Sequence, residues 1–460
     1  MDAIHAFADH VARTRLEDLP EAAMRAAKTF ILDTLGVGLA GSAGPKGAEL
    51  AAMQSRWGGG ADARVWGNGA RLPAPAAALC NAYQAHCSEF DCVHEKAVVH
   101  AMTAVLAASL AGAERAGGVS GRDLILACTL GVDVAAGLGI ASDTGLRFFR
   151  PATAGAFGAT AALGKLMGLD AVRQRHAFSI VYGQVSGTMQ AHTEGSMLLA
   201  MQLGFNTRNA VVACDLAAAG FEGPQNVLEG PFGYFRLIET KGDPGPVART
   251  LGKEWRIAEL AHKPFPSGRA THGIMDACLS IRSNAGGAFD PGAITSVTAW
   301  APPLVDHLVG RPWRPDMELN YARLCARFVA ARALIAGSLV LGDFSPAAYN
   351  DPATAALARR IAIEVRDTGD PNALTPVEVE IVMAGGSRHR AAVETVLGNP
   401  AKPLSRDAHL AKLRSNAAAA LHPVSPDAVE RLIEMVDGLE HVADVREIVD
   451  LLVPASGAGA

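Results

Sequence analysis

The chain from residue 19 to residue 220 consists largely of alanine- and glycine-rich apolar segments, and this feature restricts its possible folds most. In "LPEAAMRAAKTFILDTLGVGLAGS" (19–42) apolar residues recur at spacings of three and four, which predicts a helix. Because each glycine weakens a helix by about 1 kcal/mol relative to alanine, tertiary packing must hold such helices together. Comparable segments, each predicted to be helical, cover 74–88, 98–116, 121–142, 152–167, 169–188 and 207–220.

The pattern changes after "KPFPSGR" (263–269). Alternating or β-branched residues predict strands, and helical patterns lie between them. The expected strands are 294–302, 377–386 and 389–397, and the expected helices are 271–283, 319–340 and 352–364.

The end of the chain returns to helical patterns, from 406 to 454. "SPDAVERLIEMVDGLE" has Ser425 or Pro426 at a capping position and acids in its first turn. We therefore expect a mostly α fold with a smaller α+β domain: an all-helical domain at 1–264, completed by 400–460, and an α+β lid domain at 265–399.

Composition supports two domains and excludes some functions. A chain of 460 residues exceeds the usual size of one core, and its 50% hydrophobic content suits a large interior or an oligomer. A net charge of −5 without a Lys/Arg run argues against nucleic-acid binding. Apolar runs such as 103–112 are too short to span a membrane, and the N-terminus lacks a secretory pattern. Seven scattered cysteines indicate free thiols and a cytoplasmic location.

Titratable residues are concentrated in "HCSEFDCVHEKAVVHAM" (86–102). Cys87 and Cys92 are five residues apart and His94 and His100 six apart, so the tight spacings of zinc sites are missing. Metal binding, acid/base chemistry and a solvated loop all remain open at this point. The residues that could serve as metal ligands are His86, Asp91, His94, Glu95 and His100.

Acid/base chemistry fits the stretch better than metal binding does. His100 lies near the start of the apolar helix predicted in "AVVHAMTAVLAASLA". A neutral imidazole beside carboxylates is suited to moving a proton at neutral pH. The alternative is a core histidine whose ring is satisfied by a backbone carbonyl.

"NAYQAHCSEFDCVHEKAVVHAM" (81–102) resembles the "AHxxxFDDxH…VVHP" signature of the MmgE/PrpD family. Three further stretches are similar to the family: "ILDTLGVGLAGS" (31–42), "ATAGAFGATAALGKLMGLD" (152–170) and "KPFPSGRATHGIMDACLSI" (263–281). The family includes 2-methylcitrate dehydratase, cis-aconitate decarboxylase and iminodisuccinate epimerase. The resemblance implies a helical domain with an α+β lid, a homodimer, no metal, no organic cofactor, and short di- or tricarboxylic acids as substrates.

Carried over by position, the resemblance makes Asp91 the active-site aspartate, His100 the catalytic histidine, and Lys263 a catalytic lysine that holds substrate between the domains. These roles agree with the chemistry of proton removal α to a carboxylate, which needs a base, an acid and cations that stabilise the developing charge. The candidate substrate-binding residues are Glu89, His94, Arg150, Thr153, His192 and Arg269.

Several positions depart from the family pattern. Many relatives have a histidine where this chain has Phe149 or Arg150, and several have a lysine where it has Met201 or Gln202. The family's tyrosine is replaced by Val305, and the second aspartate of its "FDD" motif is replaced by Cys92. We expect Arg150 and His192 to replace part of the missing carboxylate-binding shell, although His192 could equally be a loop residue.

The sequence favours a cofactor-independent hydro-lyase that acts on an acid of the 2-methylcitrate or aconitate type. Epimerisation or decarboxylation of a related acid, and carboxylate binding without turnover, are the alternatives. The glycine-rich stretch 58–69 has no GxGxxG pattern and is expected to be a loop, and no GxSxG motif occurs.

Overall fold

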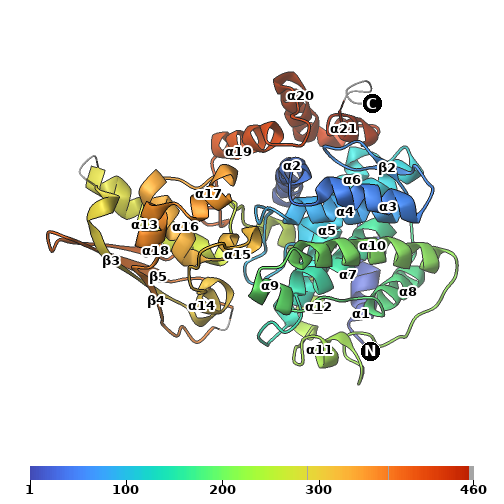
Figure 1. Ribbon diagram of the computed structural model, residues 1–460. Coiled ribbons are helices and arrows are strands. Elements are labelled where there is room, and N and C mark those ends of the chain that lie inside the picture. Colours follow the sequence, from blue (N-terminus) through green and yellow to red (C-terminus); the bar gives the residue numbers. More distant parts are fainter. Residues whose placement is uncertain (287–288, 371, 455–460) are drawn as a thin grey trace. The chain divides into compact units, whose positions relative to one another are not determined.

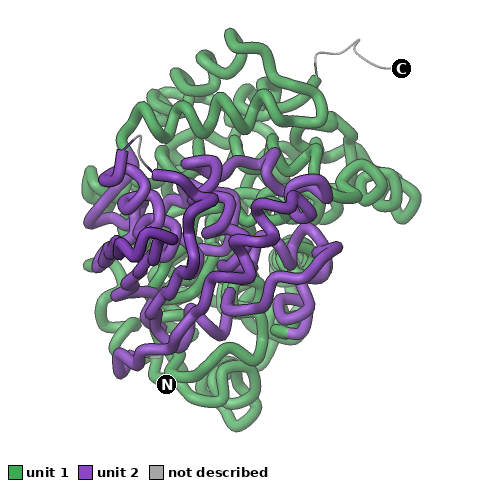
Figure 2. The backbone as a smooth tube through the Cα atoms, turned by 60° about the vertical axis from the view of Figure 1, so that its left-hand side comes forward, with its two compact units in different colours: residues 1–189, 198–260, 405–460 green, residues 190–197, 261–404 purple. Residues whose placement is uncertain are grey.

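The computed structural model describes residues 1–286, 289–370 and 372–454. The chain forms two compact units (Figure 2): unit 1 comprises residues 1–189, 198–260 and 405–460, and unit 2 comprises 190–197 and 261–404. The segment 190–197 belongs to unit 2, which the sequence pattern did not indicate. With 57% helix and 8% strand, the expected mostly helical class with a smaller mixed domain is confirmed.

Unit 1 is built from helices, which Figure 1 shows in order along the chain. Its longer helices before residue 220 are α1 (Ile4–Arg13), α2 (Glu21–Ser42), α3 (Gly47–Trp57), α4 (Ala74–His86), α5 (Ala101–Ala116), α6 (Gly121–Ala141), α7 (Arg150–Leu166), α8 (Ala171–Tyr182) and α10 (Leu198–Ala218). The expected loop at 58–69 contains one strand of a small antiparallel pair, β1 (Ala63–Arg64) with β2 (Arg71–Leu72).

Helix α7 lies at the centre of unit 1 and packs against α5, α6, α8 and α10. All of its residues from Arg150 to Gly164 are buried. Small residues allow this packing: a Cβ atom added at Gly158 would lie 2.6 Å from the carbonyl oxygen of Gly131 on α6. Gly158 therefore marks a place where two helix backbones approach closely.

Helix α6 is long and apolar enough to cross a membrane, with a mean hydropathy of 2.0, a feature that the search for long apolar runs in the sequence missed. However, 94% of that window is buried inside the protein, as in the core helix of a soluble protein. The helix begins with a capping box in which Ser120 and Asp123 bond each other's backbone amides. We therefore interpret α6 as a core helix.

The C-terminal segment belongs to unit 1. It forms α19 (Arg406–Ala418), α20 (Pro426–Asp437) and α21 (Arg446–Asp450). The Ser425 side chain caps α20 by accepting a hydrogen bond from the amide of Ala428. Lys28 of α2 pairs with Glu440 at 3.0 Å, which ties this segment to the N-terminal helices. All seven cysteines are free and buried.

Unit 2 contains a four-stranded sheet in the order β4-β3-β5-β6. Strand β3 (Ile294–Ala301) pairs in parallel with β4 (Ile361–Val365) and antiparallel with β5 (Val377–Met383), which pairs antiparallel with β6 (Arg388–Val393). Helix α13 (His272–Ala285) packs on β5 and β6 and against α16 (Ala326–Ala336).

The helix expected at 352–364 is wrong in its second half, because α18 (Pro352–Ala358) ends before β4 begins. The helix expected at 319–340 is interrupted: it consists of α15 (Leu319–Arg323) and α16.

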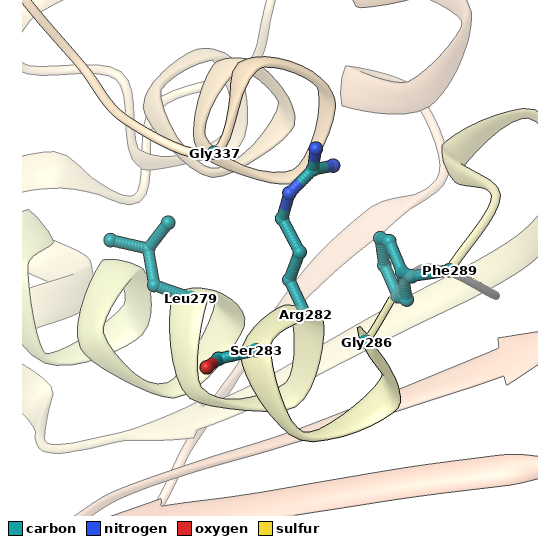
Figure 3. A pocket seen from close by; sticks show the side chains of 6 residues that line it. All are labelled: Leu279, Arg282, Ser283, Gly286, Phe289 and Gly337. Carbon is teal, nitrogen blue, oxygen red and sulfur yellow. The ribbon is translucent and has the colours of Figure 1, made fainter.

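A pocket within unit 2 lies between α13 and the end of α16 (Figure 3). The guanidinium of Arg282 projects from α13 towards Gly337 and donates a hydrogen bond to the carbonyl oxygen of Leu334, which caps α16. The residues that line the pocket are Leu279, Arg282, Ser283, Gly286, Phe289 and Gly337. This set contains no carboxylate or imidazole, so the pocket is not suited to acid/base chemistry.

Candidate active site

The loop of residues 87–100, called the 87–100 loop below, joins α4 to α5 and carries four of the nine candidate site residues. His86 is the last residue of α4, and His100 is the N-cap of α5. Within the loop, His94 and Val99 form an isolated antiparallel bridge. His86 and His100 are therefore each held at the end of a helix.

Asp91 is the centre of the cluster and is completely buried. Its Oδ2 atom lies 2.9 Å from Nδ1 of His86 and 3.3 Å from Nδ1 of His100. The hydroxyl of Thr103, from the first turn of α5, donates to the same oxygen at 2.5 Å. One carboxylate oxygen thus orients two imidazole rings.

The electrostatics of the cluster keep Asp91 ionised. Burial alone would raise the pKa of Asp91, but the charges of His100 and His86 and their hydrogen bonds lower this pKa well below its usual value. The carboxylate therefore accepts hydrogen bonds and donates none. His100 Nδ1 also lies 3.0 Å from the carbonyl oxygen of Cys92, and because both neighbouring oxygens accept hydrogen bonds, Nδ1 carries a hydrogen.

His86 belongs to the site although the sequence named it only among possible metal ligands. Its Nε2 atom lies 3.4 Å from Oε1 of Glu89, and its ring centroid lies 5.0 Å from that of His100 and 5.7 Å from that of Phe149. Glu89, a sequence candidate, is thereby brought into the cluster. The signal that could have indicated His86 is its position five residues before Asp91, at a helix end.

Cys92, which replaces a family acid, does not restore an acidic group. Burial, followed by the negative charges of Asp33 and Asp91, raises the pKa of its thiol well above the usual value. The thiol is therefore neutral near pH 7, and it cannot take the part of a second carboxylate.

His94 has structural partners at both ring nitrogens. Its Nδ1 atom accepts a hydrogen bond from the amide of Ala97 at 3.2 Å, so Nε2 carries the hydrogen that reaches Glu259 Oε2 at 2.8 Å. The hydrogen bond from His94 lowers the pKa of Glu259. The described contacts of His94 stabilise the loop, and substrate binding by His94 stays a prediction.

Arg150 and Thr153 lie in a buried network at the start of α7. Arg150 pairs with Glu239, Nε to Oε1 at 2.8 Å and Nη2 to Oε2 at 2.9 Å, and also donates to the carbonyl oxygens of Ala97 and Thr144. Thr153 Oγ1 lies 3.0 Å from the hydroxyl of Tyr234. The guanidinium contacts protein groups on several sides, which gives Arg150 a structural role; its expected contact with substrate stays untested.

Lys263, Arg269 and His192 all belong to unit 2. Arg269 donates to the carbonyl oxygens of His262 and Leu397, at 3.1 and 2.8 Å. The backbone oxygen of His192 accepts a bond from Arg311 at 3.0 Å. Lys263 is completely buried. The roles of these three residues towards substrate stay predictions.

The same cluster has the donor spacing of a possible metal site. The ligand atoms of His86, Asp91 and His100 lie within 4.8 Å of one another. The spacing rules used on the sequence did not reveal this set, because the loop and not a short motif brings the atoms together. The geometry permits either a hydrogen-bonded acid/base cluster or a metal site, and the expectation of no metal stays a prediction.

Comparison with known proteins gives the class of this chain. Residues 5–246 match the MmgE/PrpD N-terminal domain, and residues 265–441 match the MmgE/PrpD C-terminal domain. These two matches cover most of the chain, and the chain belongs to the MmgE/PrpD family.

The chain is similar to known enzymes over nearly their whole length. The cis-aconitate decarboxylase of Homo sapiens is 29% identical over 461 residues, which cover 97% of this chain and 93% of that protein. The cis-aconitate decarboxylase of Mus musculus is 28% identical over 470 residues, covering 97% and 92%. That of Aspergillus terreus is 26% identical over 461 residues, covering 95% and 93%. The relatives support an enzyme that acts on carboxylates.

Proposed function

We propose that this protein is a cofactor-independent enzyme that transfers a proton to or from a carbon atom of a short di- or tricarboxylic acid. The observation that carries the proposal is the contact of both His86 and His100 with Oδ2 of one buried, ionised Asp91. A negative charge at Nδ1 stabilises an imidazolium, so Nε2 of His100 can accept a proton and return it. Asp91 orients the ring and balances its charge.

Decarboxylation of an acid of the cis-aconitate type is the reaction we propose first. This proposal is supported by several relatives that are cis-aconitate decarboxylases and that align with nearly the whole chain. In such a reaction a carbon–carboxylate bond breaks and carbon dioxide leaves. The electron pair of the broken bond stays on the substrate, and a proton from the enzyme bonds to the carbon atom that receives this pair. Solvent then returns one proton to the histidine.

Hydration or dehydration is the second candidate, and it is favoured by the acid/base cluster itself. Water addition also places a proton on one carbon of the double bond, while hydroxide bonds to the other. The cluster of Asp91, His86 and His100 suits both reactions, because both require one proton transfer at carbon near carboxylates.

Lys263 and Arg269 are proposed to attract the substrate carboxylates. Both come from the stretch 263–269, and an acid with two or three negative charges needs cations that offset its charge during reaction. If Lys263 acts on the bound acid in both ground and transition states, Lys263→Ala raises KM and lowers kcat.

Proton NMR of the purified protein incubated separately with cis-aconitate, 2-methylcitrate, citrate and a chiral dicarboxylate tests this function. Loss of carbon dioxide from cis-aconitate supports the decarboxylase, and hydroxy-acid interconversion supports the hydro-lyase. Solvent deuterium exchange without net conversion indicates an epimerase. Thermal stabilisation by these acids without any exchange would overturn the proposal in favour of a binding protein.

We further propose a cytoplasmic homodimer. The seven buried free thiols support a reducing compartment. Exposed apolar side chains, including Phe221, Phe232 and Leu237, are of the kind that a subunit interface covers. Light scattering coupled to gel filtration tests the dimer.

A further inference from the structure

The 87–100 loop, which carries Asp91 and His100, contains two other residues whose backbone conformation is costly by itself. Glu89 has a φ of 52° and Val98 a φ of 53°, both in the left-handed region. This region is unfavourable for a β-branched residue such as valine. Backbone strain of about 1–3 kcal/mol at such a residue persists only where surrounding contacts hold the conformation.

The first such contact comes from the C-terminal segment of the chain. Lys412 of α19 donates a hydrogen bond from Nζ to the carbonyl oxygen of Phe90 at 2.9 Å, and the same ammonium lies 4.1 Å from the centre of the Phe90 ring. Lys412 Nζ also pairs with Oδ1 of Asp33 on α2 at 2.8 Å. The carbonyl that it holds belongs to the residue directly before Asp91.

The second contact comes from the first turn of α7. Arg150 donates from Nη1 to the carbonyl oxygen of Ala97 at 3.2 Å, and this residue directly precedes the strained Val98. The positive end of the α7 dipole disfavours a cation at this position. The two-point pairing of Arg150 with Glu239 offsets that effect and fixes the guanidinium plane.

The two contacts have the same arrangement. In each, a buried cation is paired with its own buried acid and donates to a main-chain carbonyl of the loop. The side chains of Lys412 and Asp33 are 5% and 1% exposed, and those of Arg150 and Glu239 are 0% and 4% exposed. Because buried ion pairs add little net stability compared with apolar packing, their presence at these two points indicates a role in positioning.

We propose that Lys412 and Arg150 are positioning residues that clamp the 87–100 loop and thereby set the distance between Asp91 and His100. The catalytic effect rests on the proposed function, whereas the clamping of the loop does not. A shift of about 1 Å in a catalytic group can lower turnover by about 100-fold. The clamps therefore act on kcat through Asp91 and His100 and leave Lys263 and Arg269, which are proposed to attract the substrate carboxylates, unchanged.

Two clamp variants and two matched controls test the proposal. Lys412→Met removes the first clamp, and Arg150→Lys keeps a positive charge for Glu239 but cannot reproduce the planar fork that also reaches Ala97. Arg414→Met, on the same helix α19, breaks the exposed pair with Glu430, and Lys241→Met breaks the exposed pair with Asp143. Neither control residue donates a described hydrogen bond to the loop.

Amide hydrogen exchange, measured by mass spectrometry without substrate, is the first readout. We expect peptides that cover 87–100 to exchange at least about 10-fold faster in both clamp variants, with other parts of unit 1 little changed. The controls should match the unchanged protein. Equal protection of this loop in folded clamp variants, or equal loss of protection in the controls, would overturn the clamps independently of any enzymatic activity.

Turnover is the second readout. We expect kcat to fall about 10- to 100-fold in both clamp variants, while KM stays within about threefold, because the loop geometry and not substrate attraction is altered. If Lys412→Met is recovered unfolded, Lys412→Gln decides the question, since its amide can donate to the Phe90 carbonyl and should restore part of kcat. Unchanged kcat in a folded clamp variant whose loop exchanges faster would overturn the positioning role.

Discussion

Nδ1 of His100 lies 3.3 Å from Oδ2 of Asp91 in the candidate site. The ionised carboxylate and the Cys92 carbonyl oxygen both accept from Nδ1 and fix its hydrogen there. In the proposed function, His100 exchanges a proton with substrate through Nε2, while Asp91 acts on the ring that does so.

Asp91→Asn removes the negative charge and keeps the shape of the side chain. We expect kcat to fall by about 100- to 10,000-fold, because an amide no longer stabilises the imidazolium and can reverse the tautomer of His100. Steady-state kinetics with circular dichroism measures the effect. Asp143→Asn, at the exposed pair with Lys241, is the control and should retain activity. A fully active Asp91→Asn protein would contradict the assignment.

His409 makes stability depend on pH. Burial lowers the pKa of this imidazole in the folded protein below its usual value. The unfolded chain therefore binds the proton more readily. The contribution of neutral His409 to the free energy of unfolding is complete above about pH 6.5, and it is lost as the pH falls from there towards the folded pKa. Thermal unfolding between pH 8 and pH 5 should show a smaller decline for His409→Gln than for the unchanged protein. Identical pH profiles would contradict this prediction.

Two glycines of α7 predict opposite effects on stability. A Cβ atom at Gly158 would lie 2.6 Å from the Gly131 carbonyl oxygen, whereas one at Gly155 would lie 3.5 Å from its nearest neighbour. Gly158→Ala should therefore lower the free energy of unfolding by about 1–3 kcal/mol. Gly155→Ala should leave it unchanged or raise it by up to about 1 kcal/mol. Urea unfolding measures both values, and equal effects would contradict the close packing of α6 and α7.

Metal removal shows whether the cluster of His86, Asp91 and His100 transfers protons or binds a metal ion. If these residues transfer protons, prolonged treatment with a chelator followed by gel filtration should leave activity intact. Elemental analysis of the treated protein confirms that metal is absent. Activity that is lost on chelation and restored by zinc, iron or magnesium would show that the cluster binds a metal ion.

Local sequence patterns predicted the fold wherever neighbouring residues determine structure. The spacing in 19–42 predicted α2, and the alternation in 294–302 predicted β3 almost to the residue. Helix α10 begins nine residues before the expected start at 207, because its mainly apolar beginning has little helical periodicity. Strand β4 was missed because its partner β3 lies far away in the sequence.

The site shows the same limit. Family motifs marked Asp91 and His100, and the structure places them together. His86 joins them only through the fold of the loop, which no spacing rule describes. Arg150 was expected to bind substrate because it lies at or beside the position where many relatives have histidine. Its partner Glu239 is 89 residues away and has no sequence signal that connects it with Arg150.

His100→Ala tests the central claim most directly. With the substrate that the NMR assay identifies, measured in deuterated water, the unchanged protein should place deuterium on a product carbon. His100→Ala should fold with a similar melting temperature yet lose at least about 100-fold in that rate, the usual scale for losing a general acid or base. His422→Ala, at an exposed position, should keep full activity. A folded His100→Ala protein that incorporates deuterium at the unchanged rate would contradict the account.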